Sequence, residues 1–112
     1  MKTYEMNLQP KYFDFIKDGT KRIELRLFDE KRSQIELGDI IEFSKSENDK
    51  LKAEVIGLLR YKSFQELFED FDISILADAS MTKEELLGVL SEFYAPEKQT
   101  QYGVVGIRLR LF

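Results

Sequence analysis

The segment Gly19–Asp29, which reads Gly-Thr-Lys-Arg-Ile-Glu-Leu-Arg-Leu-Phe-Asp, combines the alternation of a β-strand with charges of both signs. Successive side chains of a strand point to opposite faces, so one face here is aliphatic and the other is charged. The aliphatic residues are Ile23, Leu25 and Leu27, and the charged ones are Arg22, Glu24 and Arg26. Gly19 can adopt the left-handed backbone that ends a helix. The segment therefore predicts a strand that begins directly after a helix.

The elements on either side follow from the same patterns. Residues 3–8 alternate as a strand, and Pro10 suits the first turn of a helix that ends near Lys17. Two capping boxes, each a Ser or Thr with Glu three residues later, open helices at Ser63 and Thr82. Further strands are predicted at residues 40–44, 51–60 and 102–111, helices at 63–71 and 82–94, and short helical turns or loops at 29–34 and 73–77. Ala95-Pro96 is interpreted as the end of the last helix.

Strands and helices in this order predict an α+β fold. The order is β-α-β-β-β-α-α-β, with helices segregated from a run of strands. Five to six mostly antiparallel strands that curl over a small core would form a partly closed β-barrel, flanked by three to four short helices. Gly57 interrupts the longest strand and is a candidate β-bulge. The chain has no linker or repeat, so residues 1–112 are predicted to form a single domain.

Composition excludes several kinds of chemistry. The 112 residues include no cysteine and no histidine, which excludes disulfides, thiolate metal sites, cysteine nucleophiles and the Ser-His-Asp triad. Nearly all zinc chemistry is excluded as well, and no cofactor is predicted. Catalysis would have to use lysine, carboxylate, tyrosine or hydroxyl groups. No apolar run approaches the length of a membrane span and the start lacks a signal-peptide core, so the prediction is a cytoplasmic protein without a membrane partner.

The net charge of −4 is unevenly distributed. Residues 1–32 carry eight Lys/Arg and six Asp/Glu, whereas the remainder carries nine basic and fifteen acidic residues. Overall acidity argues against a broad surface for duplex nucleic acid, which requires many phosphate contacts. One local basic site remains compatible with this distribution.

The strongest candidate site is Lys21, Glu24 and Arg26. In one interpretation they form a solvated strand face with cross-strand charge pairs. In the other they line a polar cleft, where Lys21 and Arg26 receive an anionic or polar ligand and Glu24 orients one of them. Arginine offers a fixed fork of donors and lysine a movable point charge, so either could contact phosphate or a base edge.

Three further residues are candidates on weaker grounds. Glu85 is the third helical residue of the Thr82 capping box, where it stabilises a helix start, but a carboxylate there could also face a cleft as an acid or base. Tyr61 and Tyr102 lie near the ends of predicted elements, where a phenol could stack on a base. Eight other aromatic residues are assigned to the core or to half-buried helix faces. The core set is Phe13, Phe15, Phe64, Phe68, Phe71 and Phe93, and the half-buried set is Tyr12 and Tyr94.

The pattern Gly19-x-Lys21-x-x-Glu24-x-Arg26 resembles the G-x-K-x-x-E-x-R signature of the ASCH domain, a branch of the PUA-like superfamily. Two other stretches are similar to the family, namely residues 60–67, which leave a strand and cap a helix, and residues 102–107, which resemble its closing strand. The resemblance covers essentially the whole chain. It implies a PUA-like β-barrel with a cleft lined by the signature strand.

The resemblance also implies a class of ligand. ASCH family members are proposed to bind RNA or modified nucleosides, and some have been credited with ribonuclease activity. One bacterial branch hydrolyses N4-acetylcytidine with a lysine, a threonine three residues later and a distant glutamate. Lys21 matches the lysine and Glu85 lines up with the glutamate, but Glu24 stands where the threonine would be.

Three functions follow as alternatives. The first is a binding module for RNA, single-stranded rather than duplex, or for a modified nucleoside, with Lys21, Glu24 and Arg26 as polar contacts and Tyr61 or Tyr102 as a stacking platform. The second is an amidohydrolase acting on an acylated nucleoside, in which Lys21 would activate water or act as the nucleophile and Glu85 would shuttle the proton, with Glu24 as a third candidate catalytic residue. The third is a structural or protein-interaction domain.

Overall fold

The computed structural model describes all 112 residues, and its five strands form one mixed sheet. The strands are β1 (Thr3–Asn7), β2 (Ile23–Leu27), β3 (Ile40–Ser46), β4 (Asp49–Tyr61) and β5 (Val104–Leu111). Their order across the sheet is β1-β3-β4-β5-β2. β1 runs parallel to β3, and the other three pairings are antiparallel. The sheet curls into a half-barrel, which confirms the predicted α+β class and leaves β1 and β2 as its two edges.

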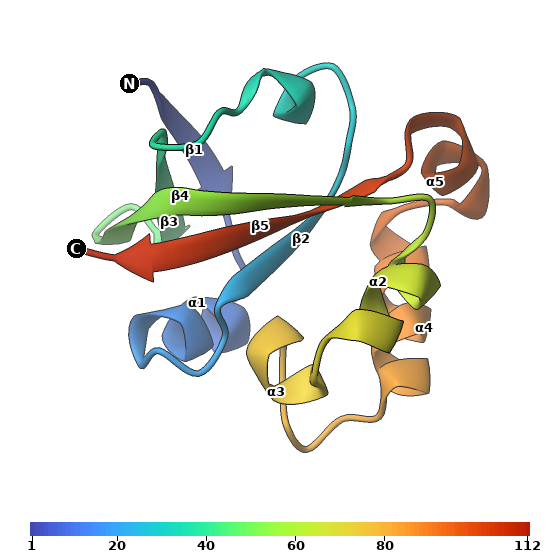
Figure 1. Ribbon diagram of the computed structural model, residues 1–112. Helices are drawn as coiled ribbons and strands as arrows, with labels where there is room; N and C mark the ends of the chain where they lie inside the picture. The colour runs from blue at the N-terminus through green and yellow to red at the C-terminus, as the bar shows by residue number, and fades with distance from the viewer.

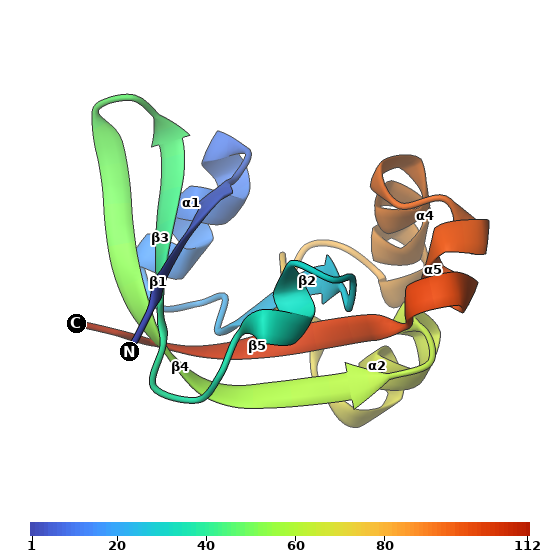
Figure 2. The same cartoon turned by 90° about the horizontal axis from the view of Figure 1, so that it is seen from above.

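Five α-helices and one short 3-10 helix, η1 (Arg32–Gln34), complete the fold. The α-helices are α1 (Pro10–Lys17), α2 (Phe64–Asp70), α3 (Ile73–Leu76), α4 (Lys83–Phe93) and α5 (Pro96–Tyr102). Figures 1 and 2 show α1 close to β3, whereas α2 to α5 gather on the other side of the molecule. None of these helices has both the length and the apolar character that crossing a membrane would require.

Two hydrophobic clusters lie on opposite faces of the sheet. The first joins α1 to the inner face of the curled sheet, with Phe13, Phe43 and Ile107 among its buried members. The second joins β2 to α2, α3 and α4, with Ile23 and Phe64 completely buried. The aliphatic residues of β2 belong to the second cluster, so its charged residues point toward the interior of the half-barrel.

Local sequence signals account for most element boundaries. Gly19 follows α1 with a φ of +86°, as expected for a residue that ends a helix. The Thr82 hydroxyl accepts from the Glu85 N–H at 3.1 Å, and the Glu85 carboxylate accepts from the Thr82 N–H at 3.1 Å, which completes the capping box. The register of β4 against β5 shifts between Val55 and Gly57, which confirms the predicted bulge.

The prediction for residues 95–102 was wrong. Pro96 does not close the helical region but opens α5, because the first helical position needs no backbone N–H. Tyr102 is consequently the last residue of α5 and not the first of a strand. This extra helix brings the number of α-helices to five, above the predicted three to four. Phe93 was also misassigned, because 58% of its surface is exposed instead of lying in the core.

Candidate functional site

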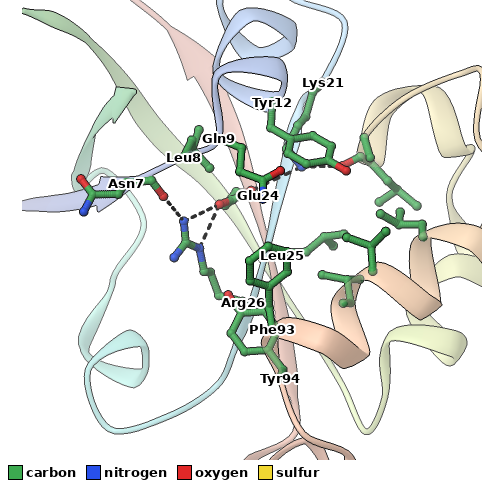
Figure 3. Close-up of a pocket in the computed structure, with 15 residues that line it drawn as sticks. Asn7, Leu8, Gln9, Tyr12, Lys21, Glu24, Leu25, Arg26, Phe93 and Tyr94 are labelled. Carbon is green, nitrogen blue, oxygen red and sulfur yellow. Dashed lines mark hydrogen bonds and ion pairs between the residues drawn. The ribbon is translucent and has the colours of Figure 1, made fainter. Parts of the chain in front are cut away.

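A pocket of about 150 Å³ lies at the open seam of the half-barrel, between β2, the turn that joins β1 to α1, and α4. Arg26 spans this seam, because its Nη2 donates to the carbonyl oxygen of Asn7 at 3.1 Å. Figure 3 shows the polar side chains at one end of the pocket and aromatic and aliphatic ones around the rest. The lining residues that matter below are Gln9, Tyr12, Lys21, Glu24, Leu25, Arg26, Phe93 and Tyr94. The three charged residues of the signature therefore meet in one concavity.

Lys21 forms the buried end of this charged group. Only 4% of its surface is exposed. Its Nζ donates to the carbonyl oxygen of Ile23 at 2.6 Å and to that of Leu76, and lies 3.4 Å from Glu24 Oε1. A lysine ammonium has three N–H donors, so these three acceptors match it completely. Burial lowers the pKa of Lys21, although the Glu24 carboxylate counteracts this effect.

Glu24 lies between two cations. Its Oε2 accepts from Arg26 Nε at 2.9 Å and lies 2.7 Å from Arg26 Nη2 in an ion pair, while Oε1 faces Lys21. Burial favours the protonated acid, but the charge of Arg26, and then that of Lys21, outweighs burial and lowers the pKa of Glu24. The carboxylate is therefore ionised at neutral pH, and Oε1 keeps a lone pair for a ligand.

Arg26 completes the charged group and keeps part of its donor capacity free. Burial alone would lower the pKa of Arg26, but the Glu24 carboxylate outweighs burial and raises it, so the guanidinium stays charged. Its Nε and Nη2 serve Glu24 and Asn7, and the Tyr94 phenol lies close enough to the guanidinium to contribute to the raised pKa of Arg26. Nη1 takes part in neither the Glu24 nor the Asn7 contact, so it is the donor that a ligand can use in competition with the Tyr94 phenol.

The backbone of Leu25 adds a donor and an acceptor to the pocket. In an antiparallel pair, alternate residues direct N–H and C=O toward the partner strand. The Phe28 N–H donates to the Gly103 carbonyl just before β5, and the Arg22 carbonyl accepts from Leu109 of β5, so the even-numbered residues of β2 face β5 and the odd-numbered ones face the free edge. Ile23 confirms the alternation, because its carbonyl bonds to Lys21 and not to β5. The Leu25 N–H and C=O accordingly point from the free edge toward the seam.

Aromatic side chains form much of the pocket wall. Tyr12 comes from α1, while Phe93 and Tyr94 lie at the end of α4, and Figure 3 shows all three around the charged group. Tyr94 also packs on Phe64, with ring centroids 6.0 Å apart. Burial raises the pKa of Tyr94, so its phenol stays neutral and can donate a hydrogen bond. The helical period of α4 places Leu86, Leu90 and Phe93 on one face, which was the available sequence signal for this wall.

Three predicted site residues lie outside the pocket. Glu85 is exposed, and its carboxylate caps the start of α4. The Tyr61 hydroxyl donates to Asp70 Oδ2 at 2.5 Å, and this hydrogen bond raises the pKa of Tyr61. The Tyr102 ring lies under the ammonium group of Lys98, 5.8 Å from its centroid. The structure thus brings Lys21, Glu24 and Arg26 together, whereas Glu85, Tyr61 and Tyr102 lie away from them.

Fold and site together define the class of protein, which is an α+β half-barrel with a pocket at its seam. The family model of the ASCH domain matches residues 6–112. The chain therefore belongs to the ASCH domain family.

Solved structures support this assignment. The crystal structure of hypothetical protein PH0355 is 44% identical with a TM-score of 0.89, and the match covers 100% of both chains. The solution structure of protein PF0455 from Pyrococcus furiosus is 39% identical with a TM-score of 0.81, covering 98% of this chain and 97% of that chain. ASCH from Zymomonas mobilis shares the fold at 14% identity and a TM-score of 0.61, covering 96% of this chain and 66% of that one. A search of curated proteins found no match.

Proposed function

We propose that the seam pocket binds one unstacked base of single-stranded RNA, or the corresponding nucleoside. The observation that carries this proposal is the ion-paired Lys21, Glu24 and Arg26 at one end of a pocket with aromatic walls. A cavity of about 150 Å³ is large enough for a single six-membered ring. The ligand portion inside the pocket is therefore one planar ring and not a base pair.

The polar groups at the end of the pocket match the edge of such a ring. Glu24 Oε1 accepts a hydrogen bond, Arg26 Nη1 donates one, and the Leu25 backbone can do both. RNA-binding proteins commonly read splayed bases through their hydrogen-bonding edges while aromatic side chains stack on their faces. A ring that carries an N–H or amino donor beside a carbonyl acceptor fits this set of partners.

The overall charge favours a single strand over a duplex. The chain is acidic, with a net charge of −4, and two of its cations at the site are already engaged with Glu24. Binding through stacking and edge contacts needs fewer free cations than binding along a duplex backbone. The affinity for one base should accordingly depend only modestly on salt.

A titration tests this proposal. Nucleosides and short unstructured oligonucleotides are added at low salt while amide shifts of Gly19–Asp29 and of α4 are followed by NMR. Stacking contributes about 1–3 kcal/mol per base, so Phe93→Ala should weaken binding by roughly 5-fold to 150-fold. Phe112→Ala is the matched control, because Phe112 is also exposed but lies outside this pocket. If no base or oligonucleotide shifts these amides, the proposal is rejected.

Hydrolysis of an acylated nucleoside is the second candidate function. It is favoured by one observation, a buried lysine with a lowered pKa that lines the pocket. Against it, the three N–H donors of Lys21 are all engaged, and Glu85 caps a helix outside the pocket. N4-acetylcytidine should yield cytidine and acetate if the enzyme hypothesis is correct, and Glu85→Gln should slow the release. Absence of turnover by the unmodified protein would refute it for this substrate, and an RNA oligonucleotide that stays intact in parallel would refute ribonuclease activity.

A further inference from the structure

We infer that Arg60, stacked on Phe28, forms a phosphate-binding site beside the seam pocket. The pocket's ligand would then be a nucleotide within an RNA strand and not a free nucleoside. This inference rests on the proposed function, because it assigns the phosphate that belongs to the bound base.

The Arg60 side chain is stacked on an aromatic ring but otherwise unengaged. Its Cζ lies 3.7 Å from the centroid of the Phe28 ring, which is the spacing of a stacked guanidinium. Arg60 is exposed, and its guanidinium forms no hydrogen bond or ion pair with the protein. Stacking restricts the side chain without using its N–H groups, so a planar fork of five donors is held ready for an anion.

Arg60 lies on the same face of the sheet as Arg26. Val105 pairs with Arg26 on one side and with Arg60 on the other, so all three side chains project from the same face. Phe28 follows Arg26 by two residues along the same strand direction, at a separation of about 6–7 Å. A base held over Arg26 would thus have its own sugar and phosphate beside Phe28 and Arg60.

The charged residues of the pocket and Asp29 are already engaged in ion pairs. Within the pocket, Lys21 and Arg26 are both paired with Glu24. Asp29 follows Phe28 directly, but its carboxylate bonds to Arg32 at 3.0 Å. Arg60 is therefore an unpaired cation on the same face of the sheet as Arg26, and the acidic residue that directly follows Phe28 is already paired. A phosphate is the part of a nucleotide that such a fork recognises best.

Binding measurements on matched ligands test the inference. Affinities are compared for a nucleoside, its 3′- and 5′-monophosphates, and a dinucleotide joined by one phosphodiester. Arg60→Gln and Phe28→Leu are compared with Arg108→Gln, which removes the same charge from the opposite face, where Arg108 pairs with Gly57 and Ile23. Ribose 5-phosphate is titrated separately while the Arg60 Nε–Hε signal is followed by NMR.

The expected result is that a phosphorylated ligand binds about tenfold more tightly than the nucleoside, which corresponds to about 1.4 kcal/mol. Arg60→Gln should abolish this difference and leave nucleoside binding unchanged, whereas Arg108→Gln should preserve it. The log–log salt dependence of dinucleotide binding should also fall by about 0.7 in Arg60→Gln, as for one lost contact to a single strand. If the monophosphates bind more tightly than the nucleoside but the dinucleotide does not, the site takes free nucleotides, which contradicts the inference that the ligand is part of an RNA strand.

Two outcomes would overturn the inference. One is equal binding of nucleoside and nucleotides, and the other is an equal loss in Arg60→Gln and Arg108→Gln, which would indicate general electrostatics. Failure of the proposed function looks different, because then no base shifts the pocket amides while ribose 5-phosphate still shifts the Arg60 signal.

Discussion

The two faces of β2 are both buried, but they are stabilised in different ways. Ile23, Leu25 and Leu27 face the helices, and each is at most 8% exposed. Glu24 is 5% exposed on the opposite face, yet it is charged and depends on the two cations that flank it. Burial of apolar area stabilises the first face, whereas the second must compensate desolvation with ion pairs. The charged face is therefore the costlier of the two to bury.

The largest effect is expected on the charged face. Glu24→Leu leaves Lys21 and Arg26 buried without a counter-charge, which should lower the free energy of unfolding by about 3–5 kcal/mol. Chemical denaturation of the variant checks this value. Glu42→Gln is the control, because Glu42 lies 4.0 Å from its lysine partners, and such a loosely paired position should change stability by less than about 0.5 kcal/mol.

A triple variant separates stability from function on this face. Lys21→Met, Glu24→Leu and Arg26→Met together replace the ion pairs by apolar side chains, which is often neutral or stabilising in proteins. The triple variant should therefore recover most of the stability that Glu24→Leu loses, while losing affinity for bases. A triple variant as unstable as Glu24→Leu would mean that the charged face is needed for folding itself.

The apolar face should respond to added volume. A Cβ at Gly106 would lie 2.9 Å from Ile23 Cγ2 and 3.1 Å from Leu67 Cδ1, closer than packed atoms approach. Gly106→Ala should therefore cost about 1–3 kcal/mol, as overpacked cores do. Gly88→Ala is the contrasting control, because no atom lies within 4 Å of its Cβ and alanine favours a helix by about 0.5–1 kcal/mol. Equal effects of the two substitutions would contradict tight packing between β2, β5 and α2.

Glu85 contrasts with the buried Glu24, because it is exposed and caps the start of α4. Thr82→Ala removes the cap of α4 and should cost about 0.5–2 kcal/mol in stability. Glu85→Gln should change stability by less than about 0.5 kcal/mol, since glutamine also serves at this position of a capping box. Neither substitution should change the affinity for bases measured by titration with nucleosides and oligonucleotides, because Thr82 and Glu85 lie outside the pocket. A large loss of binding in Glu85→Gln would instead assign Glu85 to the site.

The sequence predicted the strand at the site better than the walls around it. Alternation alone identified β2, and the spacing of Lys21, Glu24 and Arg26 fixed their common face, because a strand has a period of two. The pocket walls depend on how α1 and α4 pack across the seam, which no local pattern determines. Phe93 illustrates this limit, since its helical spacing matches that of a core residue although the seam leaves it exposed.

Access of solvent to the charged face decides between the two interpretations of this strand, a solvated face or the lining of a polar cleft. The same alternation fits an open face and a buried one, and only the coverage of β2 by α1 and α4 distinguishes them. The extra helix α5 was missed for a related reason, because proline ends one helix and begins another with the same φ. Tyr102 was placed in a strand as a consequence.

The smallest effect is expected at the rim, where an ion pair joins α1 to the segment before α4. Lys11 Nζ lies 2.9 Å from Asp78 Oδ2, and half of the Lys11 side chain is exposed, so the pair should stabilise the fold only weakly. The hydrogen bond from Lys11, followed by those from the Ser80 N–H and hydroxyl, lowers the pKa of Asp78 to about 2.

The sign of the pH dependence follows from this lowered pKa. The folded protein binds a proton at Asp78 more weakly than the unfolded chain, whose pKa is near the ordinary value of 3.8. The stabilisation is therefore complete above pH 3.8 and is lost as the pH falls through about 2. Asp78→Asn should be less stable than the unmodified protein at pH 6, and the difference should shrink toward pH 2, as measured by denaturation at each pH. Because Glu24 is present in both proteins, its own acid titration cancels in the difference, and a gap that stays constant with pH would show that Asp78 contributes through shape and not through charge.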